Sequence, residues 1–391
     1  MNNTTGKKVI AAFEHFYGHA PEVVTRAPGR VEILGNHTDY NEGVVLSAAV
    51  DRATYVAAGR RQGRKCCVHC TTTDSSATFN LDHLENPEKG AWVNYIKGLV
   101  VELQKRGKDV PAFEAALGST VPIYAGMSSS AALEMSVAYA LSVIADVDLP
   151  WQEWAKVGQS CENHYVGAQT GLLDQFSSIK GRRGQLVFSD FRTLGVRNVP
   201  LPAGTSMVIA NSMVKHTLTN EYNERRQCCE AAVEFLQKHF DGISALRDVT
   251  REQLESVKDE MESTTFKRAY HVVGENERVN AGVEALRKGD VGTFGGLMFE
   301  SHHSSREYFE NSSPELDVLV DIAHELPGRL GARLSGGGFG GITVHLVEET
   351  QAQEYSLALG EQFAQRTGLE SQIMICFADD GAEVLQRDNG S

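Results

Sequence analysis

The order of predicted helices and strands constrains the fold of this chain more than any other feature. Alternating small and β-branched residues predict strands over 44–68, 206–210 and 342–347. Apolar residues at helical spacing predict helices over 91–106, 130–145, 151–166, 221–239, 266–288 and 313–325. Because the two kinds are mixed without the regular βαβ alternation of a doubly wound sheet, the sequence predicts an α+β fold.

The midpoint of the chain carries a break in this pattern. Glycine and proline interrupt short apolar runs between 186 and 202, and a new strand follows. A chain of 391 residues has room for two to three domains. We therefore expect a boundary near 195–205, which divides the chain into 1–200 and 201–391.

Charge and hydropathy narrow the possible functions. The chain has 37 Lys and Arg against 51 Asp and Glu, a net charge of −14 that repels polyanions, so no nucleic-acid partner is expected. It contains no run of about 18 apolar residues and no apolar segment near its first residue. Neither secretion nor membrane insertion is expected, and the cytoplasm is the expected location.

The seven cysteines are an odd number spread over the chain, which favours free thiols over a disulfide framework. Cys66, Cys67, His69 and Cys70 resemble half of a zinc site, but a second ligand pair at the usual spacing is missing. A strand carrying small hydrophobic residues is the favoured alternative.

The clearest chemical motif is a loop of small residues, 125–132, that runs directly into an amphipathic helix. Unpaired backbone N–H groups and the positive end of the helix dipole meet at such a point, and Gly126 and Ser128–Ser130 would let a phosphate approach closely. An ordinary serine cap is the alternative, although three consecutive serines exceed what capping needs. The loop is predicted to bind phosphate, without being a Walker A motif.

A second glycine-rich stretch, Gly336–Gly341, formally contains G-x-G-x-x-G. It is followed by a strand pattern instead of a helix, which excludes a dinucleotide-binding fingerprint. The H-R-D and D-F-G motifs of protein kinases are missing. The stretch is predicted to lie close to a ligand or to another backbone, with a tight turn between core elements as the alternative.

Polar residues also gather in the segment 27–43, where a solvated loop is the alternative to a binding site. The planar guanidinium of Arg30 suits phosphate, and Asn36, His37 and Asp39 suit sugar hydroxyls.

Two carboxylates lie near the predicted phosphate loop. We expect Glu162 at the end of a helix and Asp174 after a glycine turn. One carboxylate could hold Mg²⁺ and the other could accept a proton from a hydroxyl, with ordinary surface carboxylates as the alternative.

Together these motifs resemble the GHMP small-molecule kinases, and within them the galactokinase family. The resemblance runs from about Phe13 to at least Val347, and its segments follow the family order: Gly29–Asn41, Trp92–Gly98, Gly126–Ala132, Gly171–Gln175, Ser313–Asp317 and Gly336–Gly341.

The resemblance implies a two-lobed enzyme with a cleft between the lobes. Its N-terminal lobe would be related to ribosomal protein S5 domain 2, and its C-terminal lobe would be ferredoxin-like. ATP and Mg²⁺ are the implied cofactors, and the implied reaction is transfer of the γ-phosphoryl group to the anomeric hydroxyl of galactose. A small sugar is the implied partner, and a monomer is slightly favoured.

The resemblance also implies a role for each site residue. Asp174 would accept the hydroxyl proton, and Arg30 would stabilise the charge on the transferring phosphoryl group. Ser130 and Glu162 would bind Mg²⁺. The other implied contacts are Gly126, Met127, Ser128 and Ser129 for the phosphates, Trp92 and Tyr95 for the adenine, and Asn36, His37, Asp39, Gly171 and Tyr222 for the sugar.

The chain departs from the family pattern at two places. It has Glu32 and Asn36 where the family usually has Asn and Glu, and Ser47 where the family usually has Pro. The family's Glu contacts the sugar's C6 hydroxyl, so the exchange bears on the C6 group of the substrate. Galacturonate or another C6-modified galactose-like sugar is therefore an alternative substrate. A catalytically silent sugar sensor is a further alternative, against which the intact Arg30, Ser130, Glu162 and Asp174 argue.

Overall fold

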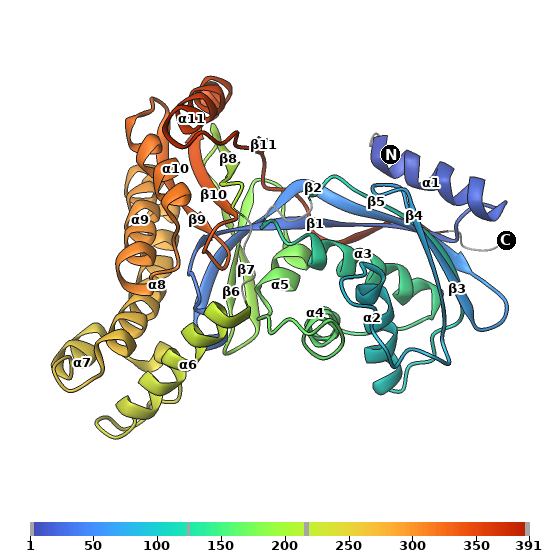
Figure 1. The fold of residues 1–391 in the computed structure, drawn as a ribbon, viewed down its shortest axis with the longest axis horizontal. Helices are drawn as coiled ribbons and strands as arrows, with labels where there is room; N and C mark the ends of the chain where they lie inside the picture. The colour runs from blue at the N-terminus through green and yellow to red at the C-terminus, as the bar shows by residue number, and fades with distance from the viewer. Residues whose placement is uncertain (1–3, 123–125, 215–218, 388–391) are drawn as a thin grey trace.

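Two lobes, each built on one β-sheet, make up the computed structural model, which describes residues 4–122, 126–214 and 219–387 (Figure 1). The strands of the first sheet are β1 (Val23–Leu34), β2 (Val44–Arg60), β3 (Lys65–Cys70), β4 (Ser75–Asn80), β5 (Phe113–Ser119), β6 (Gln185–Asp190), β7 (Gly195–Pro200) and β12 (Glu383–Arg387).

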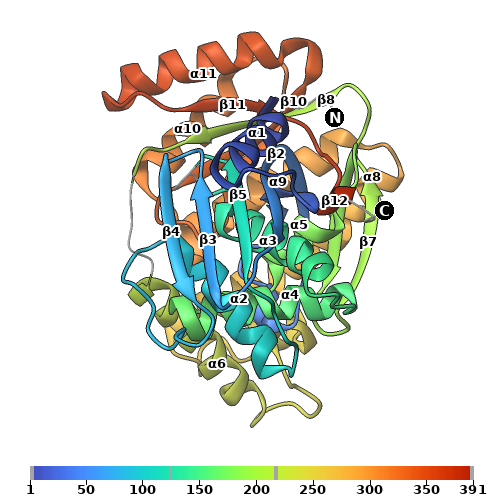
Figure 2. The same cartoon turned by 90° about the vertical axis from the view of Figure 1, so that its right-hand side faces the viewer.

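The long strand β2 organises the first sheet. Most of the strands follow the order β12-β1-β2-β5-β3-β4, and β2 also pairs with β6, which pairs with β7. All pairs are antiparallel except β3 with β5, which lie side by side in Figure 2. Residues 54–60 of β2 pair with β5 and residues 44–47 pair with β6, so this one strand reaches from the first lobe to the junction with the second.

Helices cover both faces of this sheet (Figure 1). The helix α1 (Thr4–Tyr17) packs on one face, against β2 and β5. The opposite face carries α2 (Val93–Lys105), α3 (Ser129–Ile144), α4 (Trp151–Ser160) and α5 (Leu173–Lys180). Because both faces are covered, all twelve residues of β1 are buried.

The second sheet has the order β11-β8-β10-β9 and is antiparallel throughout. In chain order its strands are numbered 4-1-3-2, the ferredoxin-like arrangement. Its strands are β8 (Thr205–Asn211), β9 (Arg329–Ser335), β10 (Ile342–Glu348) and β11 (Ile373–Cys376). The helices of this lobe are α6 (Thr219–Leu236), α7 (Arg251–Ser256), α8 (Ser263–Arg287), α9 (Val291–Ser304), α10 (Pro314–Glu325) and α11 (Ala352–Thr367).

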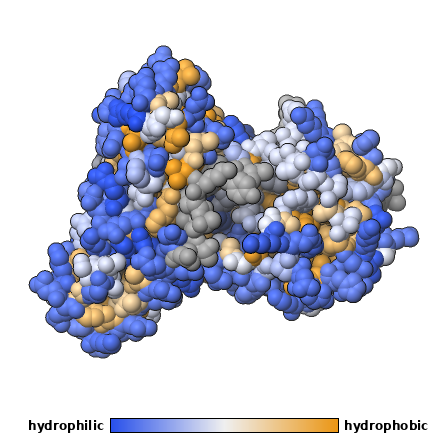
Figure 3. Space-filling view, viewed as in Figure 1, coloured by the Kyte–Doolittle hydropathy of each residue, from blue (hydrophilic) through white to orange (hydrophobic). Residues whose placement is uncertain are grey.

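A continuous apolar core joins the two lobes. Side chains of β8 alternate between its faces: Val208 packs with α10 and α11, whereas Met207 and Ile209 join a cluster that contains Val31 of β1 and Leu46 of β2. This packing fixes β1 against the second lobe, and the outer surface is predominantly hydrophilic on the face drawn in Figure 3. In the described part of the chain, no helix is long and apolar enough to cross a membrane.

The structure confirms the α+β fold and most of the predicted elements to within a few residues. The helix predicted over 151–166 ends as an α-helix at Ser160 and continues as a π-helical segment, Cys161–Val166. The helices α1, α5, α7, α9 and α11 were not predicted. The residues considered as half of a zinc site lie on strand β3, which agrees with the favoured alternative.

The division into 1–200 and 201–391 stays a prediction. Strand β7 ends at Pro200 and strand β8 begins at Thr205, on either side of this division. A division by sequence range alone nevertheless assigns β12 to the second lobe, although β12 pairs with β1 in the first sheet.

Candidate active site

Two cavities meet between the lobes. The smaller, about 280 Å³, lies beside the end of β1, and the larger, about 800 Å³, lies beside the start of α3. Both are lined by Arg30, Asp174, Gly336 and Gly337. A group bound in one cavity therefore faces a group bound in the other across these four residues.

Arg30 and Asp174 form an ion pair at this meeting point. Arg30 Nε donates to Asp174 Oδ1 at 2.7 Å, and Arg30 Nη2 lies 2.6 Å from the same oxygen. Arg30 Nη1 donates to the carbonyl oxygen of Gly126 at 2.7 Å. Ser128 Oγ donates to the other oxygen, Asp174 Oδ2, at 2.5 Å. Asp174 also lies in the first turn of α5, where the helix dipole favours a carboxylate. These contacts fix the orientation of the carboxylate.

The predicted phosphate loop lies in the larger cavity, which Gly126, Ser128, Ser129 and Ser130 line. Ser128 has a left-handed backbone (φ 51°), and α3 begins at the next residue. The first N–H groups of a helix have no partner within it, so this helix start offers donors to an anion. The side chain of Met127 is buried in the apolar core and is not part of the cavity lining, so the expected contact of this residue with the phosphates stays a prediction.

Trp92 and Tyr95 also line the larger cavity, at the start of α2. They supply flat aromatic surface in the same cavity as the helix start. The structure therefore brings together the two groups of residues that were expected at a nucleotide, although they are far apart in the sequence.

Glu162 lies near Ser130 but does not itself line the larger cavity, and it is only 2% exposed. Its Oε2 accepts hydrogen bonds from Thr170 Oγ1 at 2.6 Å and from Gln175 Nε2 at 3.2 Å. Burial and the charge of Asp174 raise the pKa of Glu162, and hydrogen bonds from Thr170, Ser130 and Gln175 partly counter this shift. Ser130 and Glu162, the two expected metal ligands, thus lie near each other.

A second buried carboxylate, Glu134, adjoins Glu162. Gln175 Nε2 also donates to Glu134 Oε2, at 3.0 Å, while Glu134 Oε1 has no hydrogen-bond partner among the described residues. Burial and the charges of Glu162 and Asp174 raise the pKa of Glu134 well above its ordinary value. The sequence analysis did not single out Glu134, which lies one helical turn after Ser130 on α3.

These residues fit a divalent cation. The charges that act on Glu162 and Glu134 are those of other carboxylates, so a cation beside Ser130 would relieve their repulsion. Within the described residues, no group of three or more His, Cys, Asp and Glu side chains is arranged to hold a metal by itself. One carboxylate and one hydroxyl, completed by phosphate oxygens and water, is the ligand set that Mg²⁺ usually has beside a nucleotide.

The loop after β1 forms one wall of the smaller cavity and contains His37. Burial lowers the pKa of His37 to about 3, so the ring is neutral. Its Nε2 lies 3.2 Å from the carbonyl oxygen of Gly337 and must donate, which leaves Nδ1 to accept from the hydroxyl of Tyr40 at 2.9 Å. The ring is held in one tautomer at the edge of the cavity.

Asp39 and Gly171 face each other in the same cavity. A Cβ at position 171 would lie 1.7 Å from Asp39 Oδ2, so only glycine lets the carboxylate occupy this place. Burial, together with the charges of Glu32 and Asp174, raises the pKa of Asp39 to about 7. The two segments that the sequence analysis treated separately are complementary in shape here.

Asn36 also lines the smaller cavity, but it is only 1% exposed. Both the nitrogen and the oxygen of its side-chain amide are hydrogen-bonded to other residues of the protein. Tyr222 belongs to α6, and its side chain lies outside the described residues. The expected sugar contacts of both residues stay predictions.

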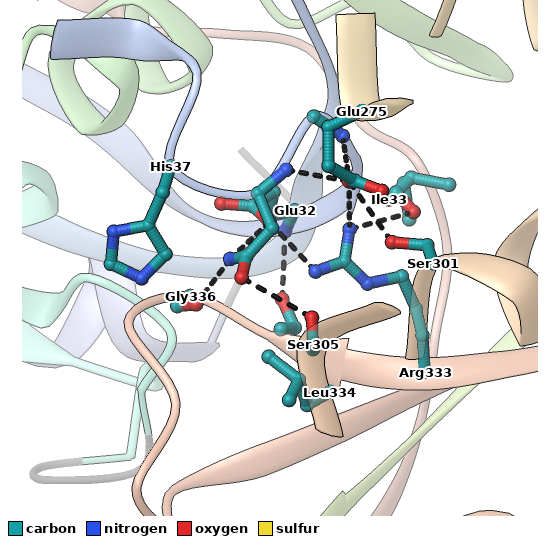
Figure 4. A network of polar contacts seen from close by, with 12 residues as sticks. Glu32, Ile33, His37, Glu275, Ser301, Ser305, Arg333, Leu334 and Gly336 are labelled. Atoms are coloured by element: carbon teal, nitrogen blue, oxygen red, sulfur yellow. Dashed lines mark hydrogen bonds and ion pairs between the residues drawn. The ribbon is translucent and has the colours of Figure 1, made fainter. Parts of the chain in front are cut away.

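The loop 35–37 is held from the second lobe by residues that the sequence analysis missed. Glu275 Oε2, on α8, accepts hydrogen bonds from the backbone N–H groups of Gly35 and Asn36 at 2.9 and 2.8 Å. Figure 4 shows the guanidinium of Arg333, on β9, between the carboxylates of Glu32 and Glu275. No local pattern distinguishes these two charged residues from surface ones.

The glycine-rich stretch connects β9 with β10 and lies close to another backbone, as predicted. A Cβ at Gly338 would lie 2.0 Å from the carbonyl oxygen of Asn311. The carbonyl oxygens of Gly336 and Gly337 accept hydrogen bonds from Asn36 and His37. The stretch thus closes the junction of the two cavities from the side of the second lobe.

Comparisons with known families agree with this arrangement. The galactokinase galactose-binding signature matches residues 11–60, which include β1 and the loop of the smaller cavity. The N-terminal domain of the GHMP kinases matches residues 94–182, and their C-terminal domain matches residues 283–365.

Relatives match over nearly the whole chain. The galactokinase of Roseiflexus sp. (strain RS-1) is 42% identical over 370 residues, 94% of this chain and 94% of its own. That of Chloroflexus aggregans is 41% identical over 378 residues, 96% of this chain and 97% of its own. The crystal structure of Lactococcus lactis galactokinase complexed with galactose superimposes with a TM-score of 0.92 at 31% identity, covering 96% of this chain and 98% of that one.

A mevalonate kinase structure, with a TM-score of 0.64 at 19% identity, shares the fold. Identity above 40% over almost the full length, together with matches to both domains and to the signature, shows that this chain belongs to the galactokinase family of the GHMP kinases.

Proposed function

We propose that this enzyme transfers the γ-phosphoryl group of MgATP to the anomeric hydroxyl of galactose. The observation that carries the proposal is the meeting of two cavities at Arg30 and Asp174. Galactose would occupy the smaller cavity and ATP the larger one. The anomeric hydroxyl and the γ-phosphoryl group would then meet beside a carboxylate and a guanidinium.

Asp174 would act as the proton acceptor. As the sugar oxygen forms its bond to phosphorus and the bond to ADP breaks, the hydroxyl proton passes to the Asp174 carboxylate. Protonation cancels the negative charge that Arg30 balances in the free enzyme. Arg30 then holds an unbalanced positive charge beside the transferring phosphoryl group, where negative charge is present in the transition state.

The nucleotide would be held by groups of the larger cavity. The start of α3, with Gly126 and Ser128–Ser130, would bind the phosphates through backbone N–H groups and hydroxyls. Trp92 and Tyr95 would contact the adenine. Ser130 and Glu162 would hold Mg²⁺, which neutralises charge on the phosphate oxygens when it is bound.

The sugar would contact His37, Asp39 and Gly171, with Asn36 in the adjoining wall and Tyr222 as a further predicted contact. The galactokinases among the relatives support galactose rather than a uronate. A silent sensor is not supported, because the Arg30–Asp174 pair has the geometry that catalysis needs. A monomer remains the expected state.

A kinase assay with a panel of sugars and the variant Asp174→Asn would test this function. Formation of sugar 1-phosphate from galactose and MgATP is expected for the parent. Asp174→Asn should lower kcat by about 10²-fold or more, the scale of a lost general base, with little change in ATP affinity. Asp321→Asn, an exposed position on α10, is the matched control and should keep full activity. Single-turnover transfer at the parent rate by a folded Asp174→Asn variant would refute the assignment.

A further inference from the structure

Glu32 and Asn36, which share one wall of the smaller cavity, differ in how much of their hydrogen-bonding capacity the protein uses. The Asn36 amide nitrogen donates to Glu32 Oε1 at 2.9 Å and to the carbonyl oxygen of Gly336 at 2.8 Å. Its oxygen accepts from Asn311 Nδ2 at 2.9 Å and from Ser305 Oγ at 3.5 Å. An amide has two donor hydrogens and two acceptor positions, so Asn36 has none left for a sugar.

Glu32 is held through only one of its two carboxylate oxygens. Oε1 accepts hydrogen bonds from Asn36 and from Arg333 Nη2, the latter at 3.0 Å. Within the described residues, Oε2 accepts no hydrogen bond, yet it is not among the polar atoms that are sealed from solvent. Because Glu32 lines the smaller cavity, Oε2 is the oxygen that it presents there.

The contacts of Glu32 pair it with a buried guanidinium and hold its carboxylate in place. Arg333 is fully buried, so its charge needs a counter-ion. Glu275 is already paired with Arg278 at 2.5 Å, so Glu32 is the counter-ion of Arg333. Burial raises the pKa of Glu32, but Arg333 and the hydrogen bond from Asn36 counter that shift. Two carboxylates, Glu32 and Glu275, thus face two guanidiniums, Arg333 and Arg278, and the network is balanced in charge.

We infer that Glu32 is the specificity-determining residue of the sugar pocket: its Oε2 accepts a hydrogen bond from a non-reacting sugar hydroxyl, and Asn36 only positions it. This inference rests on the proposed function, because it names the group that selects the sugar of that same site. A neutral hexose satisfies the free oxygen. A sugar that carries a carboxylate at that place brings a like charge against a carboxylate that cannot move or lose its counter-ion.

The test compares kcat/KM for galactose and for galacturonate, with MgATP, in the parent and in Glu32→Gln. The parent should favour galactose strongly. The ratio of the two values should fall by about 100-fold in Glu32→Gln, because the repulsion of like charges at roughly 4 Å is removed and the contact with galactose is weakened. An unchanged ratio would overturn the inference.

Glu275→Gln is the matched control, since it removes a carboxylate from the same network but from a position outside the cavity lining. Because Glu275 also holds the loop 35–37, this variant should lower the melting temperature and lower kcat/KM for both sugars in parallel, which leaves their ratio unchanged. A ratio that fell equally in both variants would show that the effect comes from disturbing the network and not from Glu32, and would overturn the inference.

If Glu32→Gln does not fold, Glu32→Asp keeps a counter-ion for Arg333 and withdraws the carboxylate from the cavity. The KM for galactose should then rise by about 10-fold while the KM for ATP stays constant, the scale of one lost hydrogen bond to a charged group. An unchanged KM for galactose would overturn the inference.

Galactose analogues that each lack one hydroxyl identify the contact. The analogue whose kcat/KM is insensitive to Glu32→Gln lacks the hydroxyl that Glu32 binds. Equal sensitivity of all analogues would contradict a direct contact. Failure of the two proposals can be told apart: a parent that phosphorylates no galactose refutes the proposed function, whereas a parent that does so, with an unchanged ratio in Glu32→Gln, refutes only this inference.

Discussion

Replacing Gly171 with alanine tests whether the carboxylate of Asp39 must stay where the structure places it. The added Cβ would lie 1.7 Å from Asp39 Oδ2 and 2.7 Å from Asp39 Cγ, whereas ordinary contacts begin at 3.4 Å. The distance from this Cβ to Asp39 Oδ2 is therefore half of the shortest ordinary van der Waals distance. Gly171 has no left-handed backbone angle, so the expected effect comes from this collision and not from backbone strain.

The size of the effect follows from the displacement. To accept the methyl group, the Asp39 carboxylate or the 168–174 segment must move by well over 1 Å, and a misplacement of about 1 Å at a reacting centre can cost roughly 10²-fold in rate. We expect Gly171→Ala to lower kcat/KM for galactose by about 10²-fold, which corresponds to about 2.7 kcal/mol of transition-state stabilisation. The KM for ATP should stay close to that of the parent, because Gly171 does not line the larger cavity.

Steady-state kinetics with each substrate varied in turn, together with the melting temperature, would measure this. Gly296→Ala on α9 is the matched control: no atom lies within 4 Å of its added Cβ, so it should leave the kinetics unchanged and stabilise the helix by about 0.5–1 kcal/mol. A Gly171→Ala enzyme with kcat/KM for galactose within about twofold of the parent would refute the reasoning, since the loss expected from displacing a contact is roughly 10²-fold.

Two further predictions concern the metal site and a buried histidine. Glu162→Gln should raise the Mg²⁺ concentration needed for half-maximal activity by about 10-fold, whereas Glu153→Gln, at a partly exposed position on α4, should not. Superimposable Mg²⁺ titrations of Glu162→Gln and the parent would contradict the metal role. Burial lowers the pKa of His345 to about 3 from 6.5, so between pH 3 and pH 6.5 this residue binds a proton in the unfolded chain but not in the folded chain. The contribution of the neutral His345 to the free energy of unfolding is therefore complete above pH 6.5 and is lost as the pH falls below it. Between pH 6.5 and pH 5 the free energy of unfolding, measured by denaturant titration, should fall by about 2 kcal/mol more in the parent than in His345→Gln. Parallel pH profiles of this free energy in the two proteins would contradict the prediction.

Much of the candidate site could be predicted from contiguous segments. The loop 126–130 and the helix after it are adjacent in the chain, so their arrangement depends on local backbone geometry. All residues of this loop except Met127 line the larger cavity. Arg30 and Asp174 were each identified in a motif of their own. Their contact joins residues 144 positions apart, and only the packing of α5 against β1 brings them together.

The predictions were weakest where a role depends on what lies across the lobe junction. Met127 belongs to the loop by sequence, yet its side chain points into the apolar core. Asn36, for which a sugar contact is predicted, is hydrogen-bonded through its amide to Asn311 and Gly336. A sequence motif specifies a side chain and its neighbours along the chain, and it contains no information on which partners will use its hydrogen-bonding capacity.

By itself, the sequence determined which chemical groups the protein has and the local elements that carry them. Helix periodicity, turn-forming glycines and capping serines act over a few residues, so these elements follow from short segments. The tertiary structure decided what each charge does. Arg333 and Glu32 are 301 positions apart, and their ion pair exists because an apolar core packs β9 and β1 together and excludes water. Electrostatic interactions depend on distance in space and on burial, and both are set only when the two lobes have packed.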